Sequence, residues 1–210
     1  LLSDLAGTLV EQTSGWNLLR EVLGINADFR DVISGKVGVE EWKEKEREDF
    51  RRKGLSYKKC EKIFEKYSQP KKGATKLLNE ARRRGYVVGI LADEPYEHLK
   101  SFFRKTFFYP DFYTCLYISY DYSGLFDKII IPYSFNGLSA KHLALRDIFY
   151  KYRPKKIIIL GDNYNDIQVF YESKSLYNNV KTIAVNPKVE DLEKVSDHIV
   201  YDLLHIIKFL

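Results

Sequence analysis

The sequence predicts an α/β fold in which a doubly wound parallel sheet carries an inserted all-helical segment. Two apolar runs end at an aspartate beside a glycine: LLSDLAGT at the start of the chain and IIILGDNYND at residues 157–166. Such runs are typical of buried strands that stop at the edge of a sheet. After residue 70, apolar strand-like runs alternate with amphipathic stretches, which is the pattern of a parallel sheet covered by helices.

The segment between the first strand and residue 70 has helical periodicity only. Its expected helices are bounded by serine or glycine, the residues that favour helix ends, and cover residues 14–23, 29–34, 39–53 and 56–67. We therefore expect an α/β core formed by residues 1–12 and 69–210, and a helical cap formed by residues 13–68.

The remainder of the core is expected to alternate strand and helix. Strands are predicted at residues 86–92, 115–119, 129–131, 156–160, 181–185 and 198–201. Helices are predicted at residues 74–84, 94–105 and 139–152, from residue 165, at residues 191–195 and at the end of the chain. Aromatic residues crowd between residues 102 and 126; we interpret them as core packing, with a subunit interface or substrate wall as the alternative.

The composition of the chain limits the classes of protein to which it can belong. The 210 residues are 45% apolar, which is enough for a proper core, and the net charge of +5 favours an anionic small molecule over nucleic acid. No apolar run approaches the ~20 residues of a membrane helix, and the first residues lack the pattern of a secretory signal. Cys60 and Cys115 have no C-x-x-C partner, so we expect a reduced, cytoplasmic protein without a zinc module.

Three carboxylates are expected to meet at one edge of the sheet. Asp4 ends the first strand, while Asp162 and Asp166 follow the strand at 156–160. Because the carboxyl ends of parallel strands share one edge, these side chains should lie close together. Three carboxylates repel one another unless a hard cation lies between them, and oxygen ligands favour Mg²⁺. The sequence therefore predicts a magnesium site.

These residues resemble the haloacid dehalogenase superfamily of phosphatases and related hydrolases. Its first motif, D-x-D-G-T, is similar to Asp4–Thr8, and its second, a strand ending in Ser or Thr, aligns with the strand that ends at Ala92. Its third motif is a lysine, for which Lys141 is the candidate, and its fourth, G-D-x-x-x-D, is matched by residues 161–166. The cap lies where members similar to phosphoserine phosphatase carry their helical cap.

The resemblance implies a role for each motif. Asp4 would be the nucleophile that forms an aspartyl-phosphate, and Lys141 would neutralise the phosphoryl oxygens. Mg²⁺ would be held by the Asp4 side chain, the carbonyl of Ala6 and Asp162, with Asp166 completing or orienting the shell. The phosphate contacts would come from Thr8, Ala92 and Lys141.

The chain departs from the family pattern at two positions. Ala6 replaces the aspartate that protonates the leaving oxygen and later activates water, a role worth roughly two to four orders of magnitude in rate. Ala92 replaces the phosphate-binding hydroxyl, and two acids, Asp93 and Glu94, follow it; near a phosphate they should point away. Both departures imply weak activity.

Three functions remain open. The leading one is Mg²⁺-dependent hydrolysis of a small phosphorylated metabolite, by a monomer or a homodimer. The second is a catalytically silent protein that binds Mg²⁺ and an anion for regulation or assembly. The third is an enzyme similar to phosphonoacetaldehyde hydrolases, whose first motif looks like D-x-A-G-T. In those enzymes a lysine of the cap forms a Schiff base with the substrate, and Lys36 is the candidate for this lysine here.

Overall fold

The structure is a computed structural model that describes residues 1–26, 32, 34–116, 134–135, 138–139 and 141–210. Its centre is a six-stranded sheet with the order β3-β2-β1-β6-β7-β8, in which every neighbouring pair is parallel. The strands are β1 (Leu2–Ser3), β2 (Gly89–Pro95), β3 (Phe112–Leu116), β6 (Ile157–Gly161), β7 (Val180–Val185) and β8 (His198–Val200). A separate antiparallel pair joins β4 (Ser134–Phe135) to β5 (Leu138–Ser139). The doubly wound parallel fold is confirmed.

The first strand occupies the middle of the sheet. Leu2 pairs with Gly89 on one side and with Ile159 on the other, so β1 lies between β2 and β6. All five residues of β6 are buried, as expected for a continuous β-branched run covered on both faces. This arrangement places the carboxyl ends of β1 and β6 side by side, although about 150 residues separate them in the sequence.

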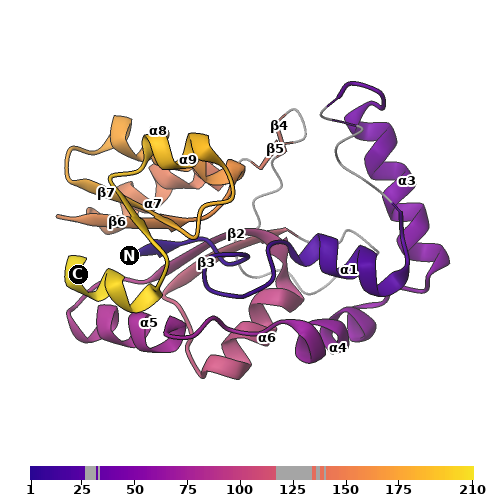
Figure 1. Ribbon diagram of the computed structural model, residues 1–210, viewed down its shortest axis with the longest axis horizontal. Helices are drawn as coiled ribbons and strands as arrows, with labels where there is room; N and C mark the ends of the chain where they lie inside the picture. Colours follow the sequence, from indigo (N-terminus) through magenta and orange to yellow (C-terminus); the bar gives the residue numbers. More distant parts are fainter. Residues whose placement is uncertain (27–31, 33, 117–133, 136–137, 140) are drawn as a thin grey trace.

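Helices cover both faces of the sheet (Figure 1). One face packs against α5 (Ala74–Arg83), α6 (Tyr96–Thr106) and the 3₁₀ helix η2 (Leu203–Phe209). The other face packs against α7 (Ala144–Tyr152), α8 (Tyr164–Leu176) and α9 (Glu190–Val195). Because strand side chains alternate, Ile158 lies in the first core and Ile159 in the second.

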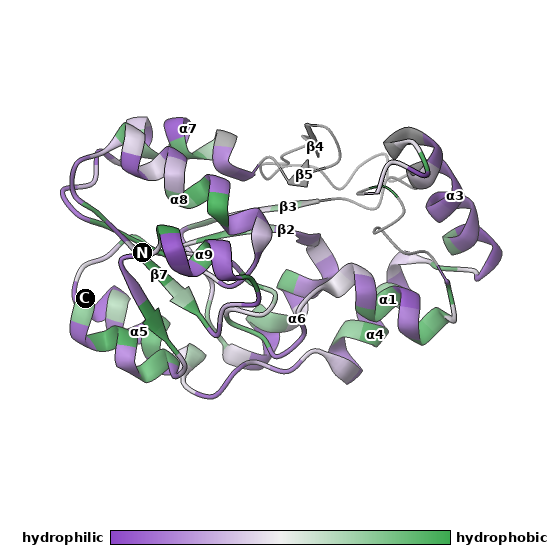
Figure 2. Cartoon of the chain, turned by 45° about the horizontal axis from the view of Figure 1, so that its top comes forward, coloured by the Kyte–Doolittle hydropathy of each residue, from purple (hydrophilic) through white to green (hydrophobic). Residues whose placement is uncertain are grey.

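The inserted segment contains α1 (Gly15–Leu23), α3 (Val39–Arg52) and α4 (Tyr57–Tyr67), each close to its predicted bounds. The hydroxyl of Ser14 accepts a hydrogen bond from the N–H of Asn17, and Gly24 ends α1 in the left-handed conformation, φ 63°. A small core of its own joins α1, α3 and α4 through Leu19, Phe50 and Phe64. Figure 2 shows that α3 is largely hydrophilic. The helix predicted at 29–34 falls mostly outside the described residues.

The two connections between core and insert run together. The N–H of Glu11 donates to the carbonyl of Gln69 (2.9 Å), and the N–H of Lys71 donates to the carbonyl of Leu9 (2.8 Å). Helix α4 then packs along α6 of the core, where the Ser101 hydroxyl donates to the carbonyl of Phe64 (3.0 Å). The base of the insert is therefore bonded to the core at several points.

Several predicted boundaries were wrong. Strand β2 begins at Gly89 rather than residue 86, because residues 87 and 88 bond to the N-terminal amine and to Asp111 instead of joining the ladder. It continues to Pro95 across a register shift, so the helix predicted from residue 94 begins at Tyr96. The helix predicted from residue 139 begins as a 3₁₀ turn, η1 (Lys141–Leu143), followed by α7.

Other boundaries differ at the ends of the sheet. The strand predicted at 115–119 lies at β3, which starts three residues earlier, and the final helix is the 3₁₀ helix η2. The strand predicted at 129–131 and the later part of the aromatic-rich stretch lie outside the described residues. Of its earlier part, Phe102, Phe103 and Phe108 are buried in the core. Phe107 is 89% exposed and Tyr109 is 64% exposed, so core packing accounts for only part of this stretch.

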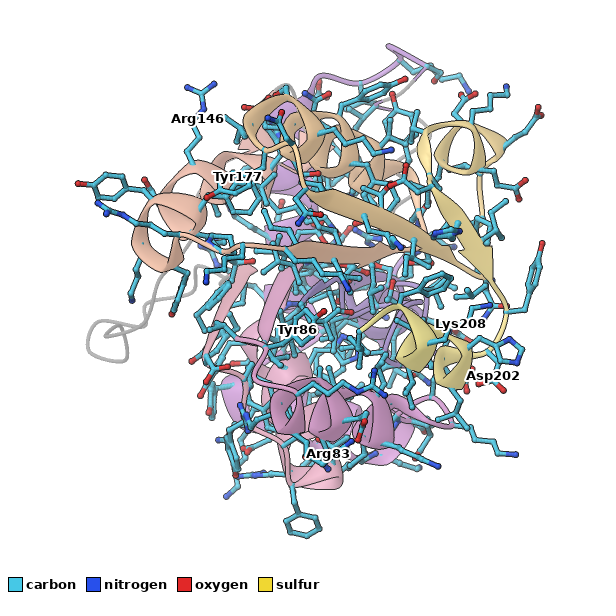
Figure 3. All side chains as sticks on the ribbon, turned by 90° about the vertical axis from the view of Figure 1, so that its left-hand side faces the viewer. Arg83, Tyr86, Arg146, Tyr177, Asp202 and Lys208 are labelled. Atoms are coloured by element: carbon cyan, nitrogen blue, oxygen red, sulfur yellow. The ribbon has the colours of Figure 1, made fainter. Side chains whose placement is uncertain are left out.

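Arg83 and Arg146 lie on the outer surface. Arg83 and Arg146 project from α5 and α7 (Figure 3). Arg83 pairs with Glu80 of the same helix at 2.7 Å, and Arg146 pairs with Glu172 at 3.2 Å. None of the helices in the described part of the chain is both long enough and apolar enough to cross a membrane.

Candidate active site

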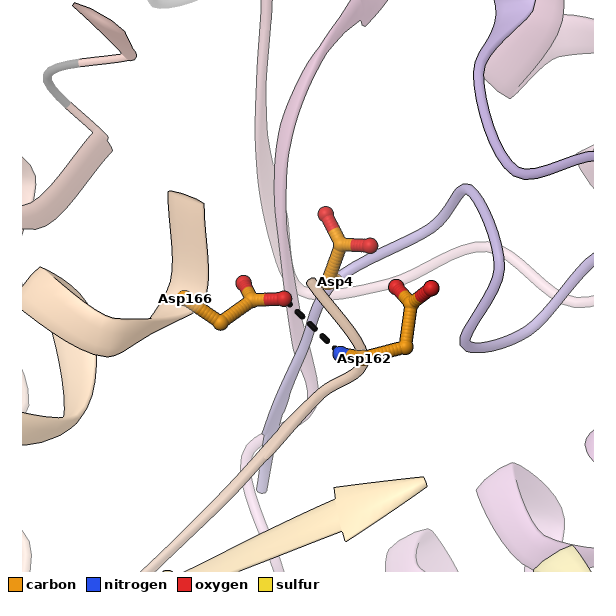
Figure 4. A group of neighbouring side chains, drawn as sticks. All are labelled: Asp4, Asp162 and Asp166. Carbon is orange, nitrogen blue, oxygen red and sulfur yellow. Dashed lines mark hydrogen bonds between the residues drawn. The ribbon is translucent and has the colours of Figure 1, made fainter. Parts of the chain in front are cut away.

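The structure brings the three predicted carboxylates together at the carboxyl edge of the sheet (Figure 4). Asp4 follows β1, and its N–H donates to the carbonyl of Leu160 in β6 (2.9 Å). One carboxylate oxygen from each of Asp4, Asp162 and Asp166 lies within 4.8 Å of the others, and all three residues are buried. The three side chains therefore lie close together, as the shared edge of the parallel strands predicts.

Asp166 is held by backbone donors. It lies in the first turn of α8, where its Oδ2 atom accepts hydrogen bonds from the N–H groups of Asp162 (2.8 Å) and Asn163 (3.1 Å). Asn163 caps the same helix, so the two side chains form a reciprocal capping box. Asp166 thus fixes the turn that presents Asp162.

Lys141 lies between two of the carboxylates. Its ammonium is 2.8 Å from Oδ1 of Asp4 and 2.6 Å from Oδ1 of Asp166, and the side chain is 3% exposed. Burial alone would lower the pKa of this ammonium, but the attraction of Asp166 and Asp4 outweighs it and holds the pKa of Lys141 well above its usual value. The lysine therefore remains charged.

One ammonium does not balance three buried carboxylates. Burial, together with repulsion from Asp166, raises the pKa of Asp162 to about 7, although Lys141 opposes the shift. Burial also holds the pKa of Asp4 well above its usual value, again against the attraction of Lys141. The Lys71 ammonium also attracts Asp162 but does not cancel the rise in the pKa of that carboxylate, so the site favours a further cation.

The carboxylate oxygens of Asp162 and Asp4 are suitable ligands for a hard divalent cation. The Oδ2 atom of Asp162 is buried and has no hydrogen-bond partner within the described residues. The Thr8 hydroxyl lies 3.1 Å from Asp162 Oδ1 and 3.4 Å from Asp4 Oδ2, so it orients both carboxylates. An unpartnered buried carboxylate oxygen costs free energy that a metal would recover. The residues present are thus compatible with Mg²⁺.

Gly7 lets the chain pass close to this site. It has φ 76°, in the left-handed region, and a Cβ atom built on it would overlap the carboxylate of Asp162. Its carbonyl accepts a hydrogen bond from the ammonium of Lys71, which comes from the second connection to the insert. Only glycine satisfies both the backbone and the space at this position.

Gly7→Ala is expected to destabilise the protein and weaken Mg²⁺ binding, since the new methyl group adds left-handed strain of ~1–2 kcal/mol and displaces Asp162. The matched control is Gly85→Ala, where φ is 81° and no atom lies within 4 Å of the added Cβ. Chemical unfolding and Mg²⁺ titration of both variants separate strain from overlap. Equal Mg²⁺ affinity in the two variants would contradict the assignment of Gly7 to the site.

The two other residues predicted to contact phosphate are engaged with protein groups. Thr8 is fully buried, and its hydroxyl faces the carboxylates of Asp162 and Asp4. The N–H of Ala92 donates to the hydroxyl of Thr114 (2.9 Å), which in turn donates to the Ala92 carbonyl (3.0 Å). A phosphate bound here would need other donors, of which Lys141 is the nearest to Asp4.

The acids that follow Ala92 take different directions. Glu94 points away, as expected: its Oε2 atom accepts from the N–H of Gly15 (2.6 Å) and lies 3.0 Å from Nδ1 of His98. Nε2 of His98 lies 2.8 Å from the hydroxyl of Ser68, so one buried network holds both connections to the insert. Asp93 stays near the site, where its Oδ2 atom accepts from the side chain of Asn165 (2.8 Å).

Two features of the site were not predicted from the sequence: the presence of Lys71 and the direction of the Asp93 side chain. Lys71 lies three residues after the predicted end of the insert at residue 68, and that position was its only sequence signal. Lys36, the candidate Schiff-base lysine, lies in an exposed turn before α3.

A comparison with protein-family models matches residues 1–170 to the haloacid dehalogenase-like hydrolase model. The chain belongs to this family. The match covers most of the chain and includes Asp4, Lys141, Asp162 and Asp166. No curated protein matches the sequence.

Solved structures of this haloacid dehalogenase-like fold cover the whole chain. A phospho-aspartyl intermediate analogue of phosphoserine phosphatase has a TM-score of 0.68 and 21% identity, with 100% of this chain and 97% of that chain covered. A phosphoserine phosphohydrolase-like protein from Francisella tularensis has a TM-score of 0.68 and 15% identity, with 100% and 98% covered. A family hydrolase from Salmonella enterica has a TM-score of 0.71 and 14% identity, with 98% and 69% covered.

Proposed function

We propose that this chain is a Mg²⁺-dependent hydrolase that removes phosphate from a small phosphorylated metabolite through an aspartyl-phosphate on Asp4. The observation that supports it best is the surroundings of Asp4: the Lys141 ammonium lies 2.8 Å from one of its carboxylate oxygens, and a carboxylate oxygen of Asp162 lies within 4.8 Å of Asp4. Two of the similar structures are a phosphoserine phosphatase and a phosphoserine phosphohydrolase-like protein, which favours a phosphate ester as substrate.

The metal would be held by the carboxylates of Asp4 and Asp162 and by the carbonyl of Ala6. Both oxygens of Asp166 already accept from protein donors, so its part is to orient Asp162. When bound, Mg²⁺ supplies the positive charge that lets an anionic nucleophile approach an anionic phosphate.

The chain's own residues then account for the first step. Asp4 attacks phosphorus in line, and the bond to the leaving oxygen breaks. The ammonium of Lys141 stays within reach of Asp4 and stabilises charge on the phosphoryl oxygens. With an alanine at position 6 and no hydroxyl at position 92, we propose low turnover, since each missing group removes transition-state stabilisation.

The test is turnover of a generic phosphate ester together with binding of Mg²⁺ and BeF₃⁻, a mimic of the aspartyl-phosphate. We expect slow Mg²⁺-dependent turnover that Asp4→Asn abolishes, while Asp147→Asn, on an exposed position of α7, leaves it unchanged. Binding of Mg²⁺ and BeF₃⁻ without any turnover would instead favour the silent, anion-binding alternative. Failure to bind either would overturn the proposal.

The phosphonoacetaldehyde-hydrolase alternative has a separate test. It requires a lysine of the insert to form a Schiff base, and Lys36 lies in an exposed turn. Borohydride reduction in the presence of an aldehyde substrate would trap such an adduct covalently. We expect no adduct, and one that disappears in Lys36→Ala would replace the phosphatase proposal.

A further inference from the structure

Asp93 lies on the strand next to the one that leads to Ala6. Ser3, the last residue of β1, pairs with Ile90 of β2. Strand β2 continues past this pair to Pro95 and carries Asp93 near its carboxyl end. The strand that neighbours β1 therefore brings a carboxylate to the edge of the sheet at which Ala6 has none.

The position of Asp93 is fixed from three elements. Its Oδ2 atom accepts from the amide of Asn165 in α8 (2.8 Å), and its carbonyl accepts from the indole N–H of Trp16 in α1 (2.9 Å). The preceding residue, Ala92, is bonded on both its N–H and its carbonyl to the Thr114 hydroxyl of β3. A group held in this way needs little reorganisation to act on a bound substrate.

Asp93 also differs from the neighbouring acids in how few of its carboxylate oxygens accept hydrogen bonds from the protein. Both oxygens of Asp166 are engaged by protein donors, and Glu94 is buried in the network with His98. Asp93 is only half-buried, and the described residues give it one side-chain hydrogen bond, on Oδ2. Its charge acts on both Asp4 and Lys141, which places it near the reacting groups.

We propose that Asp93 performs the proton transfers that Ala6 cannot, an inference that rests on the proposed phosphatase function. In the first step, the Asp4 oxygen bonds to phosphorus, the bond to the leaving oxygen breaks, and that oxygen takes the proton of the Asp93 carboxyl group. The alcohol leaves, and Asp93 is then a carboxylate.

In the second step the direction of transfer reverses. Water bonds to phosphorus, its proton moves to the Asp93 carboxylate, and the bond between phosphorus and the Asp4 oxygen breaks. Inorganic phosphate and the Asp4 carboxylate are released, and Asp93 again carries its proton. Asp93 is bonded to Trp16 of the insert through its carbonyl and to Asn165 of the core through its side chain, so it lies where the insert meets the core.

The experiment compares four full-length variants with the wild type: Asp93→Asn, Ala6→Asp, the double variant, and Asp147→Asn as the exposed control. Turnover of a phosphate ester, the level of phospho-enzyme after rapid quenching, and binding of Mg²⁺ with BeF₃⁻ are measured for each. Asp93→Asn should lower turnover by about 100-fold, with BeF₃⁻ affinity kept within about threefold. In the double variant, turnover should be at least about tenfold higher than in Asp93→Asn alone, because Ala6→Asp returns a carboxylate to the site.

Each result decides between the two proposals. Unchanged turnover in Asp93→Asn overturns the role of Asp93 and leaves the phosphatase function standing. A loss of turnover that comes with lost BeF₃⁻ binding, or that Ala6→Asp does not recover, assigns Asp93 to structure and also overturns it. No turnover and no phospho-enzyme in either the wild type or Ala6→Asp would overturn the proposed function itself. Should Asp93→Asn fold poorly by circular dichroism, Asp93→Ser provides the same comparison.

Discussion

Lys141→Met is expected to lower the unfolding free energy of the metal-free protein by about 3–5 kcal/mol, the usual cost of removing one partner from a buried ion pair. The reason is the geometry of the site. The ammonium lies within 2.8 Å of Asp4 and 2.6 Å of Asp166, and Asp162 is buried next to them. Without the ammonium, three carboxylates face one another with no positive charge between them.

The same variant should become more dependent on Mg²⁺. A ligand that binds only the folded state at 100 times its dissociation constant adds about 2.7 kcal/mol of stability, so saturating Mg²⁺ should recover much of the loss. Urea unfolding with and without Mg²⁺ measures both effects, and Lys151→Met, on the exposed surface of α7, is the control. If Lys141→Met were as stable as the control in EDTA, the ammonium would not be the counter-charge of the site.

The sequence predicted the arrangement of the site because that arrangement depends on strand ends. Apolar runs that stop at Asp4 and at Asp162 are recognisable by composition alone, and the rule that parallel strands share one carboxyl edge brings them together. The capping box at the start of α8 is also local, so the place of Asp166 follows from its distance to Asn163. These features need no knowledge of distant contacts.

The directions of individual side chains could not be predicted in this way. Asp93 and Glu94 are adjacent and chemically similar, yet one bonds to Asn165 and the other to Gly15 and His98. Asn165 and Gly15 are more than 60 residues away from these acids in the sequence. His98 lies in α6, a helix whose predicted start was two residues too early. The Thr8 hydroxyl was expected on phosphate and instead faces Asp162.

The end of β2 shows the same limit for the backbone. A buried apolar run at 86–92 indicates a strand, but the ladder begins at Gly89, because Leu1 and Asp111 take the backbone groups of residues 87 and 88. Its extension to Pro95 depends on a register shift against β3. Such boundaries are set by pairing partners and not by local propensity.

Asp162→Asn is expected to stabilise the metal-free protein increasingly as pH rises. The pKa of Asp162 is about 7 in the folded state, against an ordinary value of 3.8, so between these limits the folded protein binds more protons than the unfolded chain. The free energy of unfolding therefore falls as pH rises through this window and levels off above pH 7. The ionised carboxylate costs on the order of 4 kcal/mol at pH 8, and the amide removes this cost.

The measurement is urea unfolding of the wild type and Asp162→Asn in EDTA at several pH values between 4 and 8, with Asp147→Asn as the exposed control. The stability difference between Asp162→Asn and the wild type should be small near pH 4 and reach its full size above pH 7. Saturating Mg²⁺ should reverse the order at pH 8, because only the wild-type carboxylate can bind the metal. A difference that stays flat across this range would show that Asp162 does not titrate near neutrality, and an Asn variant that still gained stability from Mg²⁺ would remove Asp162 from the cation site.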